Sequence, residues 1–184
     1  MVEYTVSESN KRLQQILDLQ RKNLKNVISA SESQKEGFLT VEHDMEILSQ
    51  MNDPYPHIIA IDHDQVVGYT LCMEKIWRTR IPLLEEMFQQ IDHLTYKDQV
   101  LGAVNYLVMG QVCIAKSHRG QGLFSGLYNH LRMVMQPHFK YIITEISIHN
   151  KRSIRAHEKV GFEEIHRFSD DVDDWSVVIW DWNF

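Results

Sequence analysis

Hydrophobic residues recur at helical spacing in several parts of the chain, and most of these parts carry end signals. Residues 7–10 offer N-cap oxygens to a first helix. A second helix is predicted over 41–51, where Asn52-Asp53-Pro54 ends it, a third over 123–135, and a fourth over 153–160, ended by Gly161. The buried face of the first helix is predicted to consist of Leu13, Ile16, Leu17, Leu24, Val27 and Ile28.

Apolar runs between these helices predict strands. Two of them, 57–61 and 66–73, are separated by the polar residues 62–65, which is typical of a hairpin. Further strands are predicted at 2–6, 107–114, 141–148, 162–168 and 175–182, and a loop at 31–36. With no internal repeat or linker, this order predicts a single α/β domain over residues 1–184. Its central sheet is expected to be mixed and mostly antiparallel, flanked by helices.

The composition is that of an ordinary soluble protein. Among the 184 residues, 43% are hydrophobic and 24% charged, and 19 basic against 25 acidic residues give a net charge of −6. This charge argues against nucleic acid as a partner and favours a cationic or neutral acceptor. Cys72 and Cys113 lie in predicted strands and are expected to be reduced, buried thiols. Without a signal peptide, a long apolar run or a metal-binding motif, we expect a cytoplasmic protein with no metal and no membrane partner.

The segment with the clearest chemical meaning is His118-Arg119-Gly120-Gln121-Gly122-Leu123, between the predicted strand 107–114 and the predicted helix 123–135. A turn in this position directs several backbone N–H groups at one point near the positive end of a helix dipole. Its glycines let the backbone approach a bulky anion such as a phosphate or pyrophosphate. A short glycine turn can also be a plain connection, so the motif alone leaves both interpretations open.

A second motif follows about thirty residues later, in the segment from residue 150 to 162. Together the two segments resemble the GNAT superfamily of acetyl-CoA-dependent N-acetyltransferases. Its motifs are Arg-x-x-Gly-x-Gly/Ala and Asn-x-x-Ala/Ser-x-x-x-Tyr-x-x-x-Gly-Phe. The matching positions are Arg119, Gly122, Asn150, Ser153, Gly161 and Phe162. Two positions depart from the pattern, because Phe124 replaces a small residue and His157 replaces the tyrosine.

The resemblance implies acetyl-CoA as the cofactor and assigns residues to it. The pyrophosphate is expected on the N–H groups of the glycine turn, with Arg119 adding charge. The pantetheine arm is expected in a gap between the fourth and fifth strands, where an N–H near Ile114 polarises the acetyl carbonyl and Asn150 bonds the arm. The residues expected to bind the cofactor are Val112, Cys113, Ile114, Arg119, Gly120, Gln121, Gly122, Leu123, Phe124, Asn150 and Ser153.

Glu145 is the expected catalytic base. It precedes Asn150 by five residues on the fifth strand, in a register that resembles bacterial acetyltransferases of protein N-termini. Partial burial in the strand gap would raise its pKa towards the range useful for accepting a proton. The alternative is a strand glutamate that faces solvent or pairs with a lysine, because strand parity cannot be assigned from sequence alone.

His157 is the expected catalytic acid, since the tyrosine that it replaces usually protonates the departing thiolate. An imidazolium, or the N–H of a neutral imidazole, has a proton to donate. The alternative is a histidine that only packs against the acetyl-CoA tail. The other nine histidines are interpreted as surface or packing residues.

Two further segments are expected to border the acceptor. Residues 75–102 exceed the family's shorter link and indicate a helical insertion, interpreted either as a packed cap or as a lid over the acceptor pocket. Its helical pattern consists of Leu83, Leu84, Met87, Phe88 and Ile91. The loop 169–174 carries four aspartates and is either a solvated hairpin tip or an acidic wall that favours a cationic acceptor. Glu85 and Glu86 would add to that field.

We therefore expect an acetyl-CoA-dependent N-acetyltransferase that moves the acetyl group directly to a primary amine of a small molecule or peptide. One alternative is another acyl-CoA donor or an oxygen acceptor. A second is a catalytically idle domain that binds acetyl-CoA for sensing or assembly, which the departure at His157 keeps open. A homodimer is among the expected assemblies.

Overall fold

The computed structural model describes residues 1–29, 38–81 and 84–183, so the predicted loop at 31–36 and Leu83 of the insertion lie outside the described residues. The chain divides into two compact units. The first unit consists of Met1–Cys72 and Met109–Met135, and the second of Met73–Val108 and Gln136–Phe184. One domain over the whole chain stays a prediction.

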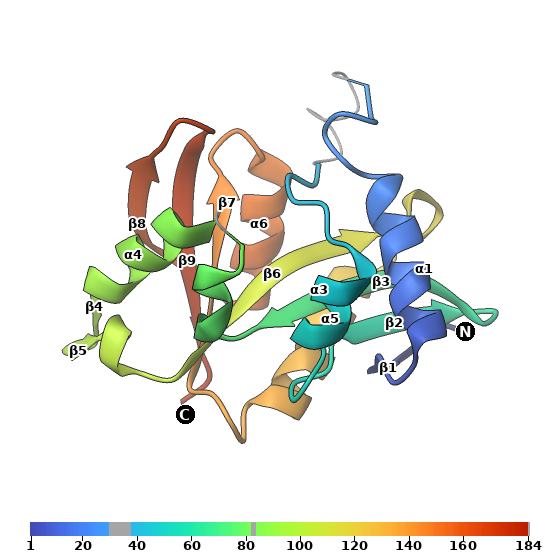
Figure 1. The fold of residues 1–184 in the computed structure, drawn as a ribbon, viewed down its shortest axis with the longest axis horizontal. Helices are drawn as coiled ribbons and strands as arrows, with labels where there is room; N and C mark the ends of the chain where they lie inside the picture. Colours follow the sequence, from blue (N-terminus) through green and yellow to red (C-terminus); the bar gives the residue numbers. More distant parts are fainter. Residues whose placement is uncertain (30–37, 82–83, 184) are drawn as a thin grey trace. The chain divides into compact units, whose positions relative to one another are not determined.

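Seven strands hydrogen-bond in the order β1-β2-β3-β6-β7-β9-β8. They are β1 (Glu3–Val6), β2 (Ile58–Asp62), β3 (Gln65–Met73), β6 (Tyr106–Ile114), β7 (Tyr141–Ser147), β8 (Glu163–Ser169) and β9 (Asp174–Asp181), as labelled in Figure 1. The β6–β7 ladder is parallel, and the β1–β2, β2–β3, β7–β9 and β8–β9 ladders are antiparallel. The predicted mixed, mostly antiparallel sheet is therefore confirmed.

The described residues of the first unit include three α-helices: α1 (Asn10–Arg21), α3 (Met45–Met51) and α5 (Leu123–Met135). Helix α1 contacts α3, while α5 lies against β1 and β2 (Figure 1). The side chain of Ser9 caps α1 and that of Asp44 caps α3, each accepting from a backbone N–H three residues on. The hairpin between β2 and β3 turns through His63 and Asp64, whose φ angles of 46° and 62° fit a tight two-residue turn.

The first predicted helix is wrong beyond Arg21. Leu24 leaves the helix to form a bridge with Leu39, and two backbone bonds join Asn23 and Lys25 to Leu39. Those bonds replace the helical ones, so Val27 is 61% exposed rather than part of a buried face. The second predicted helix likewise begins four residues late, at Met45, directly after its capping aspartate Asp44.

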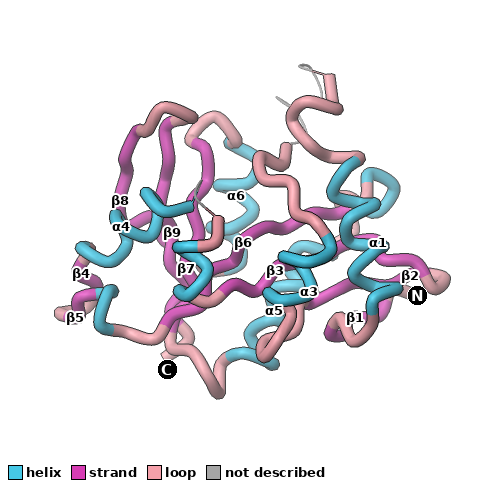
Figure 2. The backbone as a smooth tube through the Cα atoms, in the orientation of Figure 1, coloured by secondary structure: helices cyan, strands magenta, loops and turns pink. Residues whose placement is uncertain are grey.

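The second unit contains α6 (Lys151–Val160) and the predicted insertion, whose described elements are η1 (Lys75–Thr79), α4 (Glu85–His93), β4 (Thr95–Tyr96), β5 (Gln99–Val100) and η3 (Leu101–Ala103). Figure 2 shows this succession of short helices followed by a small hairpin, which the sequence did not indicate. Phe88 and Ile91 are fully buried, as the helical pattern predicted. The hairpin is anchored by Tyr96, which donates to Glu163, and by Lys97, which lies 2.6 Å from Asp181.

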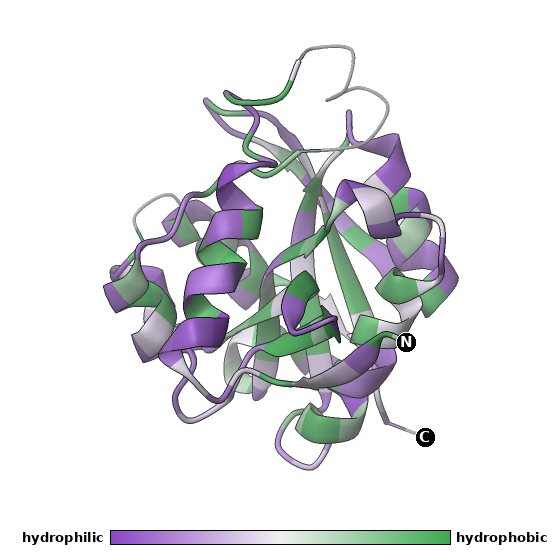
Figure 3. Ribbon diagram, turned by 90° about the vertical axis from the view of Figure 1, so that its right-hand side faces the viewer, coloured by the Kyte–Doolittle hydropathy of each residue, from purple (hydrophilic) through white to green (hydrophobic). Residues whose placement is uncertain are grey.

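Hydropathy follows these elements. In Figure 3 the hydrophobic colour concentrates along the strands, whereas the helices show both colours, the pattern of amphipathic helices packed by one face. Cys72 and Cys113 are buried, free thiols, as predicted. No helix in the described part of the chain is long and apolar enough to cross a membrane.

Candidate active site

The glycine turn links β6 to α5 through the short 3-10 helix η4 (Lys116–His118). Gly120 and Gly122 have φ angles of 75° and 81°, a region that L-residues rarely adopt. A Cβ added to either glycine would meet no described atom within 4 Å. With positive φ at both glycines, the backbone turns sharply from the extended Arg119 into α5, whose N-terminal N–H groups suit an anion.

Side chains around this turn hold it in place. Arg119 donates through Nε to the Ile114 carbonyl at 3.1 Å and through Nη2 to Asn23 Oδ1 at 2.7 Å. The amide of Gln121 donates to the Ser117 carbonyl at 3.0 Å. Arg119 therefore ties the turn to the end of α1, and its predicted charge contribution to a pyrophosphate stays a prediction.

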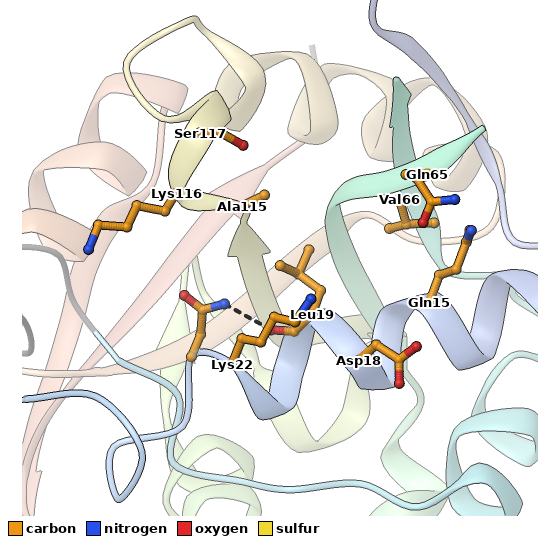
Figure 4. Close-up of a pocket in the computed structure, with 10 residues that line it drawn as sticks. Gln15, Asp18, Leu19, Lys22, Gln65, Val66, Ala115, Lys116 and Ser117 are labelled. Carbon is orange, nitrogen blue, oxygen red and sulfur yellow. Dashed lines mark hydrogen bonds between the residues drawn. The ribbon is translucent and has the colours of Figure 1, made fainter. Parts of the chain in front are cut away.

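A pocket of about 780 Å³ lies in the first unit beside η4. It is lined by Gln15, Asp18, Leu19, Lys22, Asn23, Gln65, Val66, Ala115, Lys116 and Ser117. Figure 4 shows three segments around it: α1, the start of β3, and residues 115–117. Asn23 donates to the Leu19 carbonyl at 2.8 Å and thereby closes the C-terminal end of α1. Ser117 lines this pocket, and its carbonyl accepts from Gln121 of the glycine turn. The pocket therefore lies next to the turn that is the candidate anion-binding site.

A buried polar network that sequence reasoning missed joins α1, β3, β6 and the segment before α3. The Gln20 amide donates to Gln111 Oε1 at 2.8 Å and to His43 Nδ1 at 2.9 Å, and its oxygen accepts the His43 N–H at 2.8 Å. Tyr69 donates to Gln111 Oε1 at 2.7 Å, and Gln111 donates to the Val41 carbonyl at 2.8 Å. Each side chain is at most 7% exposed. The sequence indicates this network only by polar residues at positions where the periodicity of the chain predicts core residues.

The predicted cofactor residues of β6 alternate in burial. Cys113 is buried, and burial raises the pKa of its thiol to about 12, which excludes it as a nucleophile near neutral pH. Val112 and Ile114 are half-buried. The Ile114 carbonyl is occupied by Arg119. Pairing of this strand segment with a cofactor stays a prediction.

In the second unit, β7 carries Glu145 on a defined face of the sheet. The parallel ladder with β6 covers only three pairs, from Tyr106↔Tyr141 to Val108↔Ile143. The antiparallel ladder with β9 runs the full length of β7 and places Glu145 opposite Val177. Residues directly opposite each other in such a ladder share a face, so Glu145 lies on the same face of the sheet as Val177; its place in the strand gap stays a prediction.

The environment of Glu145 is apolar and negative. Its Oε2 is buried without a hydrogen-bond partner. Burial, followed by the charges of Asp170 and Glu86, raises the pKa of this carboxyl from 4.5 to about 8. The side chain as a whole is half-buried, and no described lysine pairs with it. Its role as base stays a prediction.

The aspartate loop forms the tip of the β8–β9 hairpin, and its role as an acidic wall for a cationic acceptor stays a prediction. It is a tight turn in which Asp170 Oδ1 accepts from the N–H groups of Val172 and Asp173, both at 2.8 Å. Asp171 is exposed. Asp173 and Asp174 lie 3.6 and 3.8 Å from His149. Because Asp170 raises the pKa of Glu145, this end of the loop nevertheless acts on the candidate base.

Helix α6 holds the remaining predicted residues. The Asn150 side chain caps the helix by accepting from Ser153 N at 3.1 Å, which leaves its amide N–H groups as donors for a cofactor arm. His157 is 1% exposed and packs edge-on against Phe162. Burial lowers the pKa of His157 to about 4, so the ring is neutral near pH 7. The role of this ring as acid and its packing against the acetyl-CoA tail both stay predictions.

Comparisons with known proteins place this geometry in a family. The model of the acetyltransferase (GNAT) family matches residues 14–162. The chain belongs to the GNAT family. No curated protein matches it in sequence. Among described side chains, no group of three or more histidine, cysteine, aspartate or glutamate residues could hold a metal ion.

Solved structures of GNAT proteins share the fold at low sequence identity. The ribosomal-protein-S18-alanine N-acetyltransferase of Escherichia coli is 10% identical with a TM-score of 0.65, covering 100% of this chain and 96% of that one. NAA60 of Arabidopsis thaliana in complex with acetyl-CoA is 11% identical with a TM-score of 0.67, covering 98% and 99%. A putative acetyltransferase of Salmonella typhimurium with acetyl-CoA is 12% identical with a TM-score of 0.63, covering 100% and 95%. At such identities the likeness shows the GNAT fold.

Proposed function

We propose that this GNAT protein transfers an acetyl group from acetyl-CoA to a primary amine, with Glu145 as the general base. The observation that carries the proposal is the buried Oε2 of Glu145, which lacks a partner in a family whose chemistry needs a proton acceptor. A carboxyl with a pKa of about 8 is far more basic than an ordinary glutamate and is matched to deprotonating an ammonium near neutral pH.

The glycine turn fits the cofactor's pyrophosphate. Both glycines leave open the space that a side chain would fill, so N–H groups at the start of α5 can approach an anion closely. When bound, acetyl-CoA supplies the activated acetyl thioester. The turn would hold the pyrophosphate, a backbone N–H near Ile114 would polarise the acetyl carbonyl, and the Asn150 amide would hold the arm. Glu145 would take a proton from the acceptor's ammonium, leaving a neutral nitrogen able to attack.

A test of this function measures free thiol released from acetyl-CoA in the presence of an amine panel of polyamines, amino acids, aminoglycosides and peptide N-termini. We expect turnover with at least one amine. Glu145→Gln should abolish most of it while leaving acetyl-CoA binding intact, and Glu158→Gln, an exposed helix position, is the matched control. Equal turnover in the Glu145→Gln variant would overturn the assignment of the base.

The second candidate is a catalytically idle acetyl-CoA-binding domain with a sensing or assembly role. The observation that favours it is the buried, neutral His157 at the position of the family's acidic tyrosine. Calorimetric binding of acetyl-CoA without thiol release for any amine would support this candidate. A cytoplasmic location and a homodimer stay predictions of the sequence.

A further inference from the structure

Glu145 shares its sheet face with a group of aromatic residues in the second unit. The ladders align Glu145 with Val177 and His166 in one row, and Ser147 with Trp175 and Phe168 in the next. Side chains that lie directly opposite on neighbouring strands are separated by about 5 Å at Cβ. We call Glu145, His166, Phe168 and Trp175 the acidic–aromatic face.

The aromatic part of this face is partly open to solvent. His166 and Phe168 are half-buried, and their rings stack with centroids 6.4 Å apart and an interplanar angle of 13°. Trp175 is 8% exposed beside them. The π faces of aromatic rings attract cations, and tryptophan does so most strongly. These side chains therefore suit a ligand that is both apolar and positively charged.

Two further carboxylates, Asp170 and Glu86, raise the pKa of Glu145 by their charge. Glu86 is exposed on the first turn of α4, and Asp170 lies at the loop after β8. Burial raises the pKa of Asp170, but the backbone N–H groups of Asp173 and Val172, which donate to its carboxylate, help to lower it below its usual value, so this group stays ionised near neutral pH. In the described contacts, no lysine or arginine pairs with Glu145, Asp170 or Glu86. The negative charge of these carboxylates could therefore be neutralised by a cationic ligand.

A monoamine carries one positive charge, and three carboxylates are more than are needed to bind it and to take its proton. Glu145 alone is used to deprotonate the reacting nitrogen, which leaves Asp170 and Glu86 to neutralise another charge. An acceptor that carried its own carboxylate would be repelled by Asp170 and Glu86, and also by Glu145 once it is deprotonated. Resting on the function proposed above, we infer that the acceptor is a diamine or polyamine whose second ammonium is held by Asp170, Glu86 and the acidic–aromatic face.

The test compares three acceptors of equal chain length: 1,4-diaminobutane, butylamine and 4-aminobutanoate. We expect kcat/KM to be highest for the diamine, by about 10-fold or more over butylamine at low salt, and lowest for the amino acid. The diamine's advantage should shrink at high ionic strength, because salt screens partly exposed charges. Heat-induced unfolding of the coenzyme A-bound protein with each amine gives a readout of binding that needs no turnover.

Variants separate this inference from general disruption. Glu86→Gln should raise KM for the diamine several-fold with less effect on butylamine, as expected for one lost exposed charge contact. Glu85→Gln is the matched control, because Glu85 lies one position away on the same turn, accepts from Gln89 and does not act on the pKa of Glu145. Phe168→Leu keeps apolar bulk but loses the π face, and should also raise KM for the diamine.

The outcomes distinguish the inference from the function on which it rests. Turnover of all three amines without a preference for the diamine, or a preference for 4-aminobutanoate, would overturn the inference and leave N-acetyl transfer standing. A stabilising shift with the diamine alone, without turnover of any amine, would support the binding face and overturn the proposed reaction. Equal thermal shifts with the diamine and butylamine would overturn the inference whatever the turnover.

Discussion

His157 Nδ1 lies 2.8 Å from the carbonyl oxygen of Ser153, one helical turn earlier in α6. A carbonyl only accepts, so the neutral ring carries its proton on Nδ1 and keeps a lone pair on Nε2. A ring in this state has no second N–H to give to a departing thiolate. Because burial lowers the pKa of His157 to about 4, a proton on Nε2 becomes available only in acid.

We therefore expect His157→Phe to retain turnover within about 3-fold of wild type, outside the 10²–10⁴-fold range of a true general acid. Its pH–rate profile should be unchanged between pH 6 and 9. His157→Tyr is the informative partner, because it restores the family residue and a proton that persists to about pH 10. A large loss in His157→Phe that His157→Tyr rescues would show that the position protonates the thiolate after all.

Glu145 should govern the pH dependence of turnover. As a base it must be deprotonated, so kcat/KM should rise with pH and level off above about 8, the pKa that burial and its acidic neighbours give it. Glu145→Gln should lower kcat by roughly 10²-fold and remove this limb. Initial rates from pH 6 to 10 measure both effects. A rate limb near pH 8 that persists in the Gln variant must belong to another group.

The same carboxyl should make the fold less stable as pH rises. Its pKa is about 8 in the folded chain against an ordinary 4.5, so between these values the native state binds more protons than the unfolded state. Stability therefore falls from pH 4.5 to 8 and stays low above it. Glu145→Gln should raise Tm at pH 8.5 but not at pH 4, and each ~1 kcal/mol gained corresponds to about 2–4 °C. Paired thermal melts at the two pH values test this.

Two substitutions at Gly122 can separate the effect of backbone strain on stability from the effect of an added side chain on ligand binding. Valine there adds a side chain to space in which no described atom lies within 4 Å of the Cβ, and it is strained at a φ of 81°, whereas asparagine tolerates positive φ better. Both variants should weaken acetyl-CoA binding by on the order of 2 kcal/mol, but only Gly122→Val should lower Tm markedly. Calorimetric titration and thermal melts measure the two effects. Unchanged affinity in folded Gly122→Asn would contradict a pyrophosphate site at this turn.

Substitutions at Gln111 and Tyr69 in the buried polar network should have non-additive effects on the free energy of unfolding. Gln111→Leu leaves the Tyr69 hydroxyl and the Val41 carbonyl without their bonds and should cost about 1–3 kcal/mol per unsatisfied group in urea unfolding. Tyr69→Phe should cost less, because Gln111 Oε1 still accepts from Gln20. Since both residues share one oxygen, the double variant should cost less than the sum of the single changes.

Periodicity predicted the element order well, because buried faces impose regular spacing. It failed where long-range backbone bonds compete with a local pattern, as at Leu24, whose bridge to Leu39 ends the helical spacing early. The hairpin β4–β5 was missed because it is two residues per strand, too short for an alternating pattern.

The candidate site was only partly predictable. The residues of the glycine turn and of α6 follow from motifs because neighbours in sequence set their geometry. The face on which Glu145 lies depends on pairing with β9, more than thirty residues away, and a shift of one residue would reverse it. His166 and Phe168 join that face through a register shift between Glu164 and His166, which no local spacing reveals.

The two buried thiols give the protein a built-in reporter of its own opening. Cys72 is 1% and Cys113 6% exposed, and burial raises the pKa of both thiols, so neither offers a reactive thiolate to a disulfide reagent while the first unit stays closed. Such a reagent, added to an assay, would count coenzyme A without a background from the folded chain. Without coenzyme A, the slow labelling that remains would time how often the strands around β3 and β6 come apart.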